Sequence, residues 1–311
     1  MQPIQIYLAG TFWFGIGKDQ KEYNKLLDSE KPFALNVKQR LESYHYVGKQ
    51  KLVDDIRASG EQIFLDSGAF SAKSLGIEIS IEEYCQYIQT NEDIIRKDDG
   101  VLVASVLDAI GDPQATYENQ KKMESLGVRP LPCFHQGEDE RYLEYYLANY
   151  EYITVGGIVG GNPVQLEIWL DRIFNNHILD GAGRPRAKVH GFGMTSIPLM
   201  ERYPWYSCDS SSWIQTTAFG SITIPTAGNL NVSKESPDRH NAGKHLDTLT
   251  PIERDYIEGL IRAAGHDPDQ LRQRYHARAV YNIWAYQEIE RLINQKKAAM
   301  ANRQPVKQEL F

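Results

Sequence analysis

Several short apolar runs of this chain end in side chains of the types that catalysis requires. In residues 62–71, QIFLDSGAFS, an apolar run delivers Asp66 into a Ser-Gly-Ala turn, as when a buried parallel strand ends beside a ligand. Four further runs end in the same manner: VASVLDAI, LPCFHQGE, ITVGGIVGG and WYSCDSSSW. The last of these brings a second carboxyl group, Asp209. Two carboxylates in one pocket push their pKa values apart, so that one can donate a proton while the other stays ionised.

These side chains also have ordinary structural interpretations. Asp66, Asp108 and Asp209 could each cap the helix that follows through a side-chain oxygen. His190 could be a core histidine with satisfied hydrogen bonds. The glycines of residues 156–161 could serve tight packing or form a phosphate-binding nest. Because they do not match GxGxxG, a dinucleotide-binding fold is rejected.

The apolar runs read as strands, and helical patterns lie between them. Residues 40–47 are the weakest strand, because Leu41, Tyr44 and Val47 would also suit one face of a helix. At the start of residues 80–91, Ser80 and Glu83 form a capping box, which predicts a helix. The expected strands are 4–10, 40–47, 63–66, 101–107, 128–134, 152–155, 188–189 and 205–208, and the expected helices between them are 49–59, 80–91, 113–126, 140–148 and 163–175.

Eight strand-then-helix steps predict an α/β protein, a (β/α)8 or TIM barrel, over residues 1–220. In such a barrel the ligand site is built from the loops at the carboxyl ends of the strands, where the polar side chains named above fall. A doubly wound open sheet is the alternative. After Asp209 the alternation of strands and helices ends. An extra β segment, a polar loop and a helical pattern over residues 250–295 follow. Residues 221–311 are therefore expected to form a C-terminal extension that is mostly helical and packs on the barrel.

Composition narrows the class of protein. The chain has 311 residues and a net charge of −7, which argues against the broad basic coat of a nucleic-acid packaging protein. No apolar run approaches the roughly 20 residues that span a bilayer, and no signal peptide is visible, so we expect a cytoplasmic protein without a membrane partner. The three cysteines are far apart in sequence, and we expect no disulfide framework, no metal and no cofactor.

Six motifs resemble, in order, those of the guanine transglycosylases: DSGAF at 66–70, VLD at 106–108, HQG at 135–137, VGGIVGG at 155–161, HGFG at 190–193 and CD at 208–209. The resemblance covers roughly residues 62–212. Members of this family are barrel enzymes that exchange a guanine in nucleic acid for a 7-deazaguanine. The tRNA enzymes carry DSGGY or DSGGF, VQGG, GGLAVGE, MGVG and FDC at the matching places. The short chain is most similar to the phage and bacterial DpdA-type DNA guanine transglycosylases.

The resemblance implies a role for each of the two aspartates. Breaking an N-glycosidic bond develops positive charge at C1′, and a carboxylate on the face opposite the departing base can attack it. Asp209 would be this nucleophile and would form a covalent glycosyl-enzyme intermediate. Asp66 would be the general acid and base, donating a proton toward the leaving guanine and taking one from the incoming base. Two successive displacements retain the configuration at C1′.

The resemblance also implies how the base is read. Asp108 would accept the N1–H and amino hydrogens of guanine, while Gln136 and the backbone N–H of Gly157 would donate to O6. Phe70 and His190 would stack on the two faces of the base, which must be flipped out of a duplex to reach the site. The expected substrate-binding residues are Ser67, Phe70, Asp108, Gln136, Gly156, Gly157 and His190.

The chain departs from the tRNA enzymes in three respects. It has no CxCxxC zinc cluster after Cys208, and Ala69 replaces the second glycine of DSGG. Gly160 and Gly161 stand where the family has Gly-Glu, so a carboxylate that could contact an aminomethyl group is missing. The expected partners are therefore guanine-containing DNA and the free nitrile-bearing base preQ0 or a relative, with a homodimer or an accessory protein left open.

Three alternatives remain open from the residues alone. A tRNA-guanine transglycosylase would use the same site on tRNA. A barrel glycoside or nucleoside hydrolase would use the same two carboxylates and release a reducing sugar. A non-catalytic nucleic-acid-binding barrel would bind DNA in a salt-sensitive manner and perform no exchange.

Overall fold

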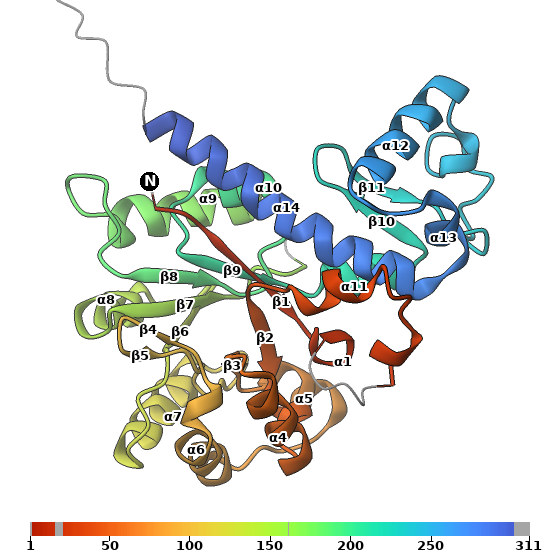
Figure 1. The fold of residues 1–311 in the computed structure, drawn as a ribbon. Coiled ribbons are helices and arrows are strands. Elements are labelled where there is room, and N and C mark those ends of the chain that lie inside the picture. The colour runs from red at the N-terminus through yellow and green to blue at the C-terminus, as the bar shows by residue number, and fades with distance from the viewer. Residues whose placement is uncertain (1, 16–20, 161, 302–311) are drawn as a thin grey trace, which may run out of the picture.

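The centre of the protein is a curled sheet of seven parallel strands (Figure 1). The computed structural model describes residues 2–15, 21–160 and 162–301. The strand order β3-β2-β1-β9-β8-β7-β6 places the first strand of the chain in the middle of the sheet, between the second strand and the last. The seven strands are β1 (Gln5–Ala9), β2 (Arg40–Ser43), β3 (Phe64–Asp66), β6 (Cys133–His135), β7 (Tyr152–Gly156), β8 (Lys188–Gly191) and β9 (Ser207–Ser210).

The prediction of an α/β protein is confirmed, but the prediction of a closed eight-stranded barrel is wrong. Residues 101–107 do not form the expected fourth strand of the sheet. Only β5 (Val101–Leu102) is a strand, and it pairs antiparallel with β4 (Lys97–Asp98) in a separate hairpin. The sheet is therefore a half-barrel with β3 and β6 at its edges.

Residues 103–106 cross this gap without forming a regular strand. Two isolated bridges span it, Leu65 with Ala104 and Ser105 with Leu131. Leu131 uses both of its backbone groups here, since its N–H donates to Ala104 O at 2.7 Å and its C=O accepts the N–H of Val106 at 3.0 Å. The segment bonds to each edge of the sheet at single residues only.

Helices follow most strands and cover the outside of the sheet. They are α4 (Gln50–Ser59), α5 (Ala69–Leu75), α6 (Ile81–Thr90), α7 (Pro113–Ser125), α8 (Glu140–Asn149), α9 (Pro163–Ile173), α10 (Ile197–Arg202) and α11 (Ser212–Ala218). The five predicted helices are confirmed to within a few residues. Side-chain caps fix their starts: Ser80 accepts a hydrogen bond from the N–H of Glu83, and Asp112 accepts one from the N–H of Ala115.

Shorter elements fill the connections. The ambiguous residues 40–47 contain both predicted elements, because β2 ends at Ser43 and α3 (Tyr44–Val47) begins directly after it. The other short elements are α1 (Phe12–Gly15), α2 (Lys31–Leu35), the 3-10 helices Tyr23–Lys25, Glu92–Ile94 and Leu246–Thr248, and a π-helix at Phe174–Ile178.

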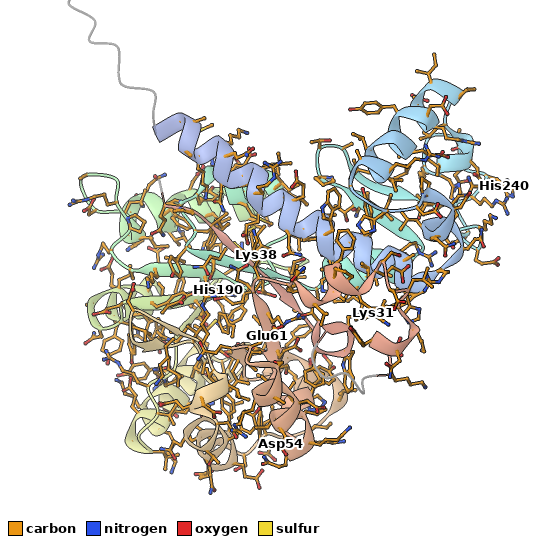
Figure 2. The ribbon with its side chains drawn as sticks, viewed as in Figure 1. Lys31, Lys38, Asp54, Glu61, His190 and His240 are labelled. Carbon is orange, nitrogen blue, oxygen red and sulfur yellow. The ribbon has the colours of Figure 1, made fainter. Side chains whose placement is uncertain are left out.

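The inside of the curled sheet has an apolar layer and a polar layer. The apolar layer consists of Tyr7, Leu41, Phe64, Val103, Leu131 and Tyr152, all of them buried. Because side chains alternate along a strand, the inward residues two positions further on lie nearer the carboxyl ends, and these include Asp66 and Asp209. His190 belongs to the same interior and lies at the centre of the molecule, whereas His240 lies at its periphery (Figure 2).

The C-terminal part of the chain begins with a hairpin of β10 (Ser221–Ile224) and β11 (Gly228–Asn231). The predicted helical stretch 250–295 is broken into three helices, α12 (Pro251–Ala263), α13 (Pro268–Gln273) and α14 (Tyr275–Ala301). The last ten residues of the expected extension lie outside the described part. The hairpin and α12 and α13 pack around a core of their own, with Ile222, Val232 and Leu246 at its centre.

The long helix α14 runs across both parts of the molecule (Figure 1). At one end Asn294 bonds both the N–H and the C=O of Ile4, at 2.8 Å each, and Glu290 accepts the N–H of Ile6. Nearer its start, the buried Asn282 accepts the N–H of Thr223 in the hairpin. Neither this helix nor any other described helix is long and apolar enough to cross a membrane.

Candidate active site

Strand register brings the predicted side chains to one end of the sheet. Asp66 is the last residue of β3 and pairs with Ser43 of β2, while Asp209 of β9 pairs with Tyr7 of β1. His135 of β6 pairs with Gly156 of β7. Carboxyl ends of parallel strands meet at the same edge, so residues from distant parts of the sequence converge here.

Asp66 is held by its own turn and by a neighbouring serine. The N–H of Gly68 donates to Oδ2 at 2.9 Å, and the hydroxyl of Ser105 donates to Oδ1 at 3.3 Å. The N–H of the buried Ser67 donates to the same hydroxyl oxygen at 2.8 Å. Gly68 has φ of 80°, and a Cβ there would lie 2.4 Å from Ser43 Oγ, so the turn requires glycine.

Burial raises the pKa of Asp66 to about 6, from its ordinary value of 3.8. Within this net shift the negative charges of Asp209 and Asp108 also raise the pKa, while the hydrogen bonds from Gly68 and Ser105 lower it. The negative charge of Asp209 therefore favours the protonated form of Asp66. Asp66 keeps its proton to a higher pH than an exposed aspartate does.

Asp209 is bound asymmetrically. Its side chain is nearly buried, and Oδ1 accepts two hydrogen bonds, from the N–H of Gly193 at 2.7 Å and from His190 Nε2 at 3.3 Å. Within the described residues Oδ2 has no hydrogen-bond partner. Oδ1 thus holds the carboxylate in place, and Oδ2 could contact a ligand.

A buried chain of hydrogen bonds supports His190 from behind. Its Nδ1 lies 2.6 Å from Ser207 Oγ, which lies 2.6 Å from the hydroxyl oxygen of Tyr152. If Nε2–H donates to Asp209, then Nδ1 must accept from Ser207, and Ser207 must in turn accept from Tyr152. Each hydrogen is then used once, and the neutral imidazole is locked in a single tautomer.

His190 is consequently not placed as a stacking surface. Its side chain is fully buried, and its ring lies 4.6 Å from the ring of Phe64 and 4.7 Å from that of Phe192, centre to centre. Phe70 lies on α5 and is 73 % exposed. The ring of Phe70 is thus exposed and could contact a ligand, whereas the ring of His190 is buried and bonds to Asp209.

Asp108 is engaged at both oxygens. The hydroxyl of Thr116 donates to Oδ1 at 2.8 Å, and His135 Nε2 lies 2.8 Å from Oδ2. His135 Nδ1 is in turn 2.8 Å from Glu138 Oε1, and Cys133 Sγ is 3.4 Å from Nε2. Burial lowers the pKa of His135, but the interactions with Cys133, Asp108 and Glu138 outweigh it and raise that pKa above its ordinary value.

The residues predicted to bind O6 of the base lie side by side. A Cβ on Gly157, whose φ is 74°, would be 3.0 Å from the backbone nitrogen of Gln136. Gln136 and Gly157 are exposed at the ends of β6 and β7, whereas Gly156 is buried against the ring of His135. Gly161, which belongs to the preQ0 argument, lies outside the described residues.

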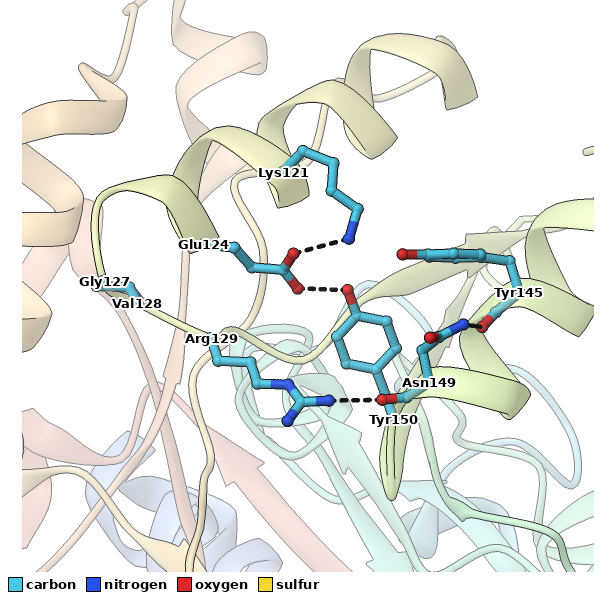
Figure 3. A pocket seen from close by; sticks show the side chains of 8 residues that line it. All are labelled: Lys121, Glu124, Gly127, Val128, Arg129, Tyr145, Asn149 and Tyr150. Carbon is cyan, nitrogen blue, oxygen red and sulfur yellow. Dashed lines mark hydrogen bonds and ion pairs between the residues drawn. The ribbon is translucent and has the colours of Figure 1, made fainter.

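Two cavities of about 380 Å³ differ in what they could bind. One is lined by Asp108, Leu107 and residues of α5, and it lies at the carboxyl ends of the strands. The other lies at the opposite end, where Figure 3 shows Glu124 bonded to Lys121 and Tyr150. Because the charged side chains of the second cavity already have partners, only the first belongs to the candidate site.

Sequence reasoning missed Ser105, Cys133, His135, Glu138, Tyr152 and Ser207. Cys133 and His135 stand two apart on one strand, a spacing that places both on one face, and this signal was visible in LPCFHQGE. The hydrogen bonds of Tyr152 and Ser207 depend on the register between strands, which no local pattern reports.

In the comparisons with known proteins, no protein-family model matches the chain, and no curated protein matches its sequence.

Proposed function

We propose that the protein is a DNA guanine transglycosylase that exchanges guanine for preQ0 or a related 7-deazaguanine. The observation that carries the proposal is the contrast between the two aspartates. Asp209 is fixed through Oδ1, and its Oδ2 has no hydrogen-bond partner among the residues that the structure describes, whereas burial raises the pKa of Asp66 to about 6. A nucleophile and a proton donor in one site need this difference.

In the proposed reaction Asp209 Oδ2 attacks C1′ of the flipped nucleotide. The bond from C1′ to N9 of guanine breaks, and the leaving base takes the proton of Asp66. The incoming 7-deazaguanine then gives its N9 proton to Asp66 and attacks C1′, which releases Asp209. Protons balance over the cycle, and two inversions retain the configuration.

Base recognition in the proposal uses the cavity beside Asp108. Thr116 and His135 fix this carboxylate, and each of its oxygens keeps a second lone pair with which it can accept from guanine. Gln136 and the N–H of Gly157 lie together at the neighbouring strand ends and would donate to O6. Phe70 would provide the stacking face, and His190 supports the nucleophile.

Exchange of labelled base tests the proposal. The full chain is incubated with radiolabelled preQ0 and guanine-containing DNA, and label in DNA and released guanine are measured. We expect the wild type to exchange and Asp209→Asn to form no covalent adduct and no product. The matched control is Asp112→Asn, because Asn can also cap the start of α7 and Asp112 has no role in the proposed reaction. Equal labelling by wild type and Asp209→Asn would overturn the proposal.

The substrate class is tested in the same assay. Single-stranded DNA, duplex DNA and tRNA are run side by side with the same labelled base. Labelling of tRNA alone would replace the proposal with the tRNA enzyme. Release of base or reducing sugar without incorporation of label would replace it with a hydrolase.

A further inference from the structure

Three side chains around the end of β6 form a cluster of metal-ligand type. Cys133 Sγ, His135 Nε2 and a carboxylate oxygen of Asp108 lie within 4.8 Å of one another. Cys133 and His135 project from the same face of β6, and Asp108 approaches from the segment that bridges the edges of the sheet. A thiolate, an imidazole and a carboxylate together are a ligand set typical of Zn²⁺.

The distances fit a cation of this size. For tetrahedral Zn²⁺, bonds of about 2.0–2.3 Å place an N and an O ligand about 3.3 Å apart, and an N and an S ligand about 3.6 Å apart. Here Nε2 is 2.8 Å from Asp108 Oδ2 and 3.4 Å from Cys133 Sγ, and all three ligand atoms lie within 4.8 Å of one another. Shifts of a few tenths of an ångström would bring the two pairs that include Nε2 to the metal-bound spacing.

The surroundings orient the three ligand atoms. His135 Nδ1 pairs with Glu138 Oε1 at 2.8 Å, and a histidine that binds a metal through one nitrogen commonly donates its other N–H to a carboxylate. This pairing points Nε2 at the cluster. Thr116 holds the other oxygen of Asp108 in the same manner, at 2.8 Å.

The space around the cluster is also suitable. Gly156 faces the cluster from β7, and a Cβ there would lie 2.8 Å from His135 Nε2 and 3.3 Å from Cys133 Sγ. Cys133 is buried, while the side chains of His135 and Asp108 keep 18 % and 15 % of their surface exposed.

We infer that Asp108, Cys133 and His135 form a binding site for Zn²⁺, with Glu138 orienting His135 and one coordination position open toward the mouth of the sheet. Three protein ligands with a fourth position free for water or substrate are the arrangement of catalytic rather than structural zinc. The inference does not depend on the exchange reaction. Both proposals use Asp108, but Cys133 belongs to the metal site alone.

The test measures metal rather than turnover. The untagged full chain is stripped with a chelator, reloaded with Zn²⁺ or Co²⁺, and freed of excess metal. We expect one Zn²⁺ per chain, and with Co²⁺ a thiolate-to-metal absorption band together with the visible bands of tetrahedral cobalt. Cys133→Ser should remove the charge-transfer band, and Glu138→Gln should weaken Zn²⁺ binding about 10- to 100-fold.

Two control variants are available in the chain. His177 contacts two carboxylates, those of Glu140 and Glu144, at 2.8 and 2.7 Å and lies outside the cluster, so His177→Gln should leave metal binding unchanged. Cys85→Ser changes another buried cysteine, on α6, and should keep the cobalt spectrum.

Two results would overturn the inference. The first is a wild-type protein that holds no stoichiometric Zn²⁺ and gives no charge-transfer band, which requires no variant to fold. The second is a band that persists in a folded Cys133→Ser protein. Failure of base exchange in a protein that binds Zn²⁺ would instead count against the proposed function alone.

Discussion

At the scale of single residues, the two aspartates differ because of what donates to them. Asp66 receives one backbone N–H on one oxygen and one hydroxyl on the other, and its burial favours the neutral acid. Asp209 receives two donors on a single oxygen, which an ionised carboxylate accepts readily. The proposed division of labour is thus a property of neighbours and not of residue type.

The pKa of Asp66 predicts a pH dependence for the first chemical step. Because burial raises this pKa to about 6, the proton that leaves with guanine is present below pH 6 and is lost above it. We expect the single-turnover rate of adduct formation to fall about tenfold per pH unit above 6, or about 100-fold by pH 8. Asp112→Asn should show the wild-type profile. A rate that is flat from pH 5 to 8 would exclude Asp66 as the acid.

Tyr152 offers a test of the buried chain behind His190. Tyr152→Phe removes the hydroxyl that supplies Ser207, and we expect a loss of about 1–2 kcal/mol in the free energy of unfolding, measured with urea. Tyr7→Phe is the matched control, because the hydroxyl of Tyr7 is buried with no hydrogen-bond partner in the described structure. Equal losses in the two variants would contradict a stabilising hydrogen bond between Tyr152 and Ser207.

The sequence predicted the positions of Asp66 and Asp209 at strand ends but not the groups that form hydrogen bonds with them. Asp66 and Asp209 follow apolar runs, so their places at strand ends were readable from local pattern. The contacts of His190 with Ser207 and Asp209 join different strands, so they depend on register and remained hidden. For the same reason the stacking role expected for His190 does not match its burial.

At the scale of elements, most helices could be predicted because their caps and apolar stripes are local. The lack of a fourth strand could not, because it depends on how residues 103–106 pair with segments distant in sequence, where only isolated bridges to Leu65 and Leu131 form. Likewise the pattern over residues 250–295 correctly predicted helical structure, but it did not show that the segment divides into the three helices α12, α13 and α14.

Glu42 of β2 links two elements and predicts a trend in stability with pH. It is buried and accepts the N–H of Phe12 at 2.7 Å, and burial raises its pKa to about 8. The folded protein therefore binds this proton more tightly than the unfolded chain does. The free energy of unfolding that the protonated Glu42 contributes is fully present below pH 4.5 and is lost as the pH rises through 8.

Glu42→Gln carries no titrating group, so its stability relative to wild type should increase with pH. Between pH 5 and pH 9 we expect a gain of about 3–5 kcal/mol, since one pKa unit corresponds to about 1.4 kcal/mol. The measurement is urea unfolding at each pH, with the exposed Glu78→Gln as control. A gain of similar size in the control, or none in Glu42→Gln, would contradict the assignment.

At the scale of the whole molecule, α14 connects the sheet to the C-terminal hairpin. Asn282 does this through buried hydrogen bonds: it accepts the N–H of Thr223 and donates to Trp213 O, Thr217 Oγ1 and Ser221 O. The side chain thereby satisfies backbone groups of both α11 and β10. Removing it would leave those groups buried without partners.

We therefore expect Asn282→Ala to lower the free energy of unfolding by about 2–4 kcal/mol. Gln287→Ala on the same helix is the control, because Gln287 accepts only a long, exposed hydrogen bond of 3.4 Å from the N–H of Lys38 within the described residues. Calorimetry also shows whether the hairpin and the sheet unfold together. Two separate transitions in the wild type would contradict a single cooperative unit.

The position of β1 inside the sheet has a consequence for biosynthesis. This strand is synthesised before its neighbour β9, which begins 198 residues after β1 ends (207 − 9), and α14 follows later still. At roughly 5–20 residues per second, translation leaves one edge of β1 unpaired for about 10–40 s. The nascent chain must therefore hold a half-paired strand, with one edge open to other strands, until β9 has been made.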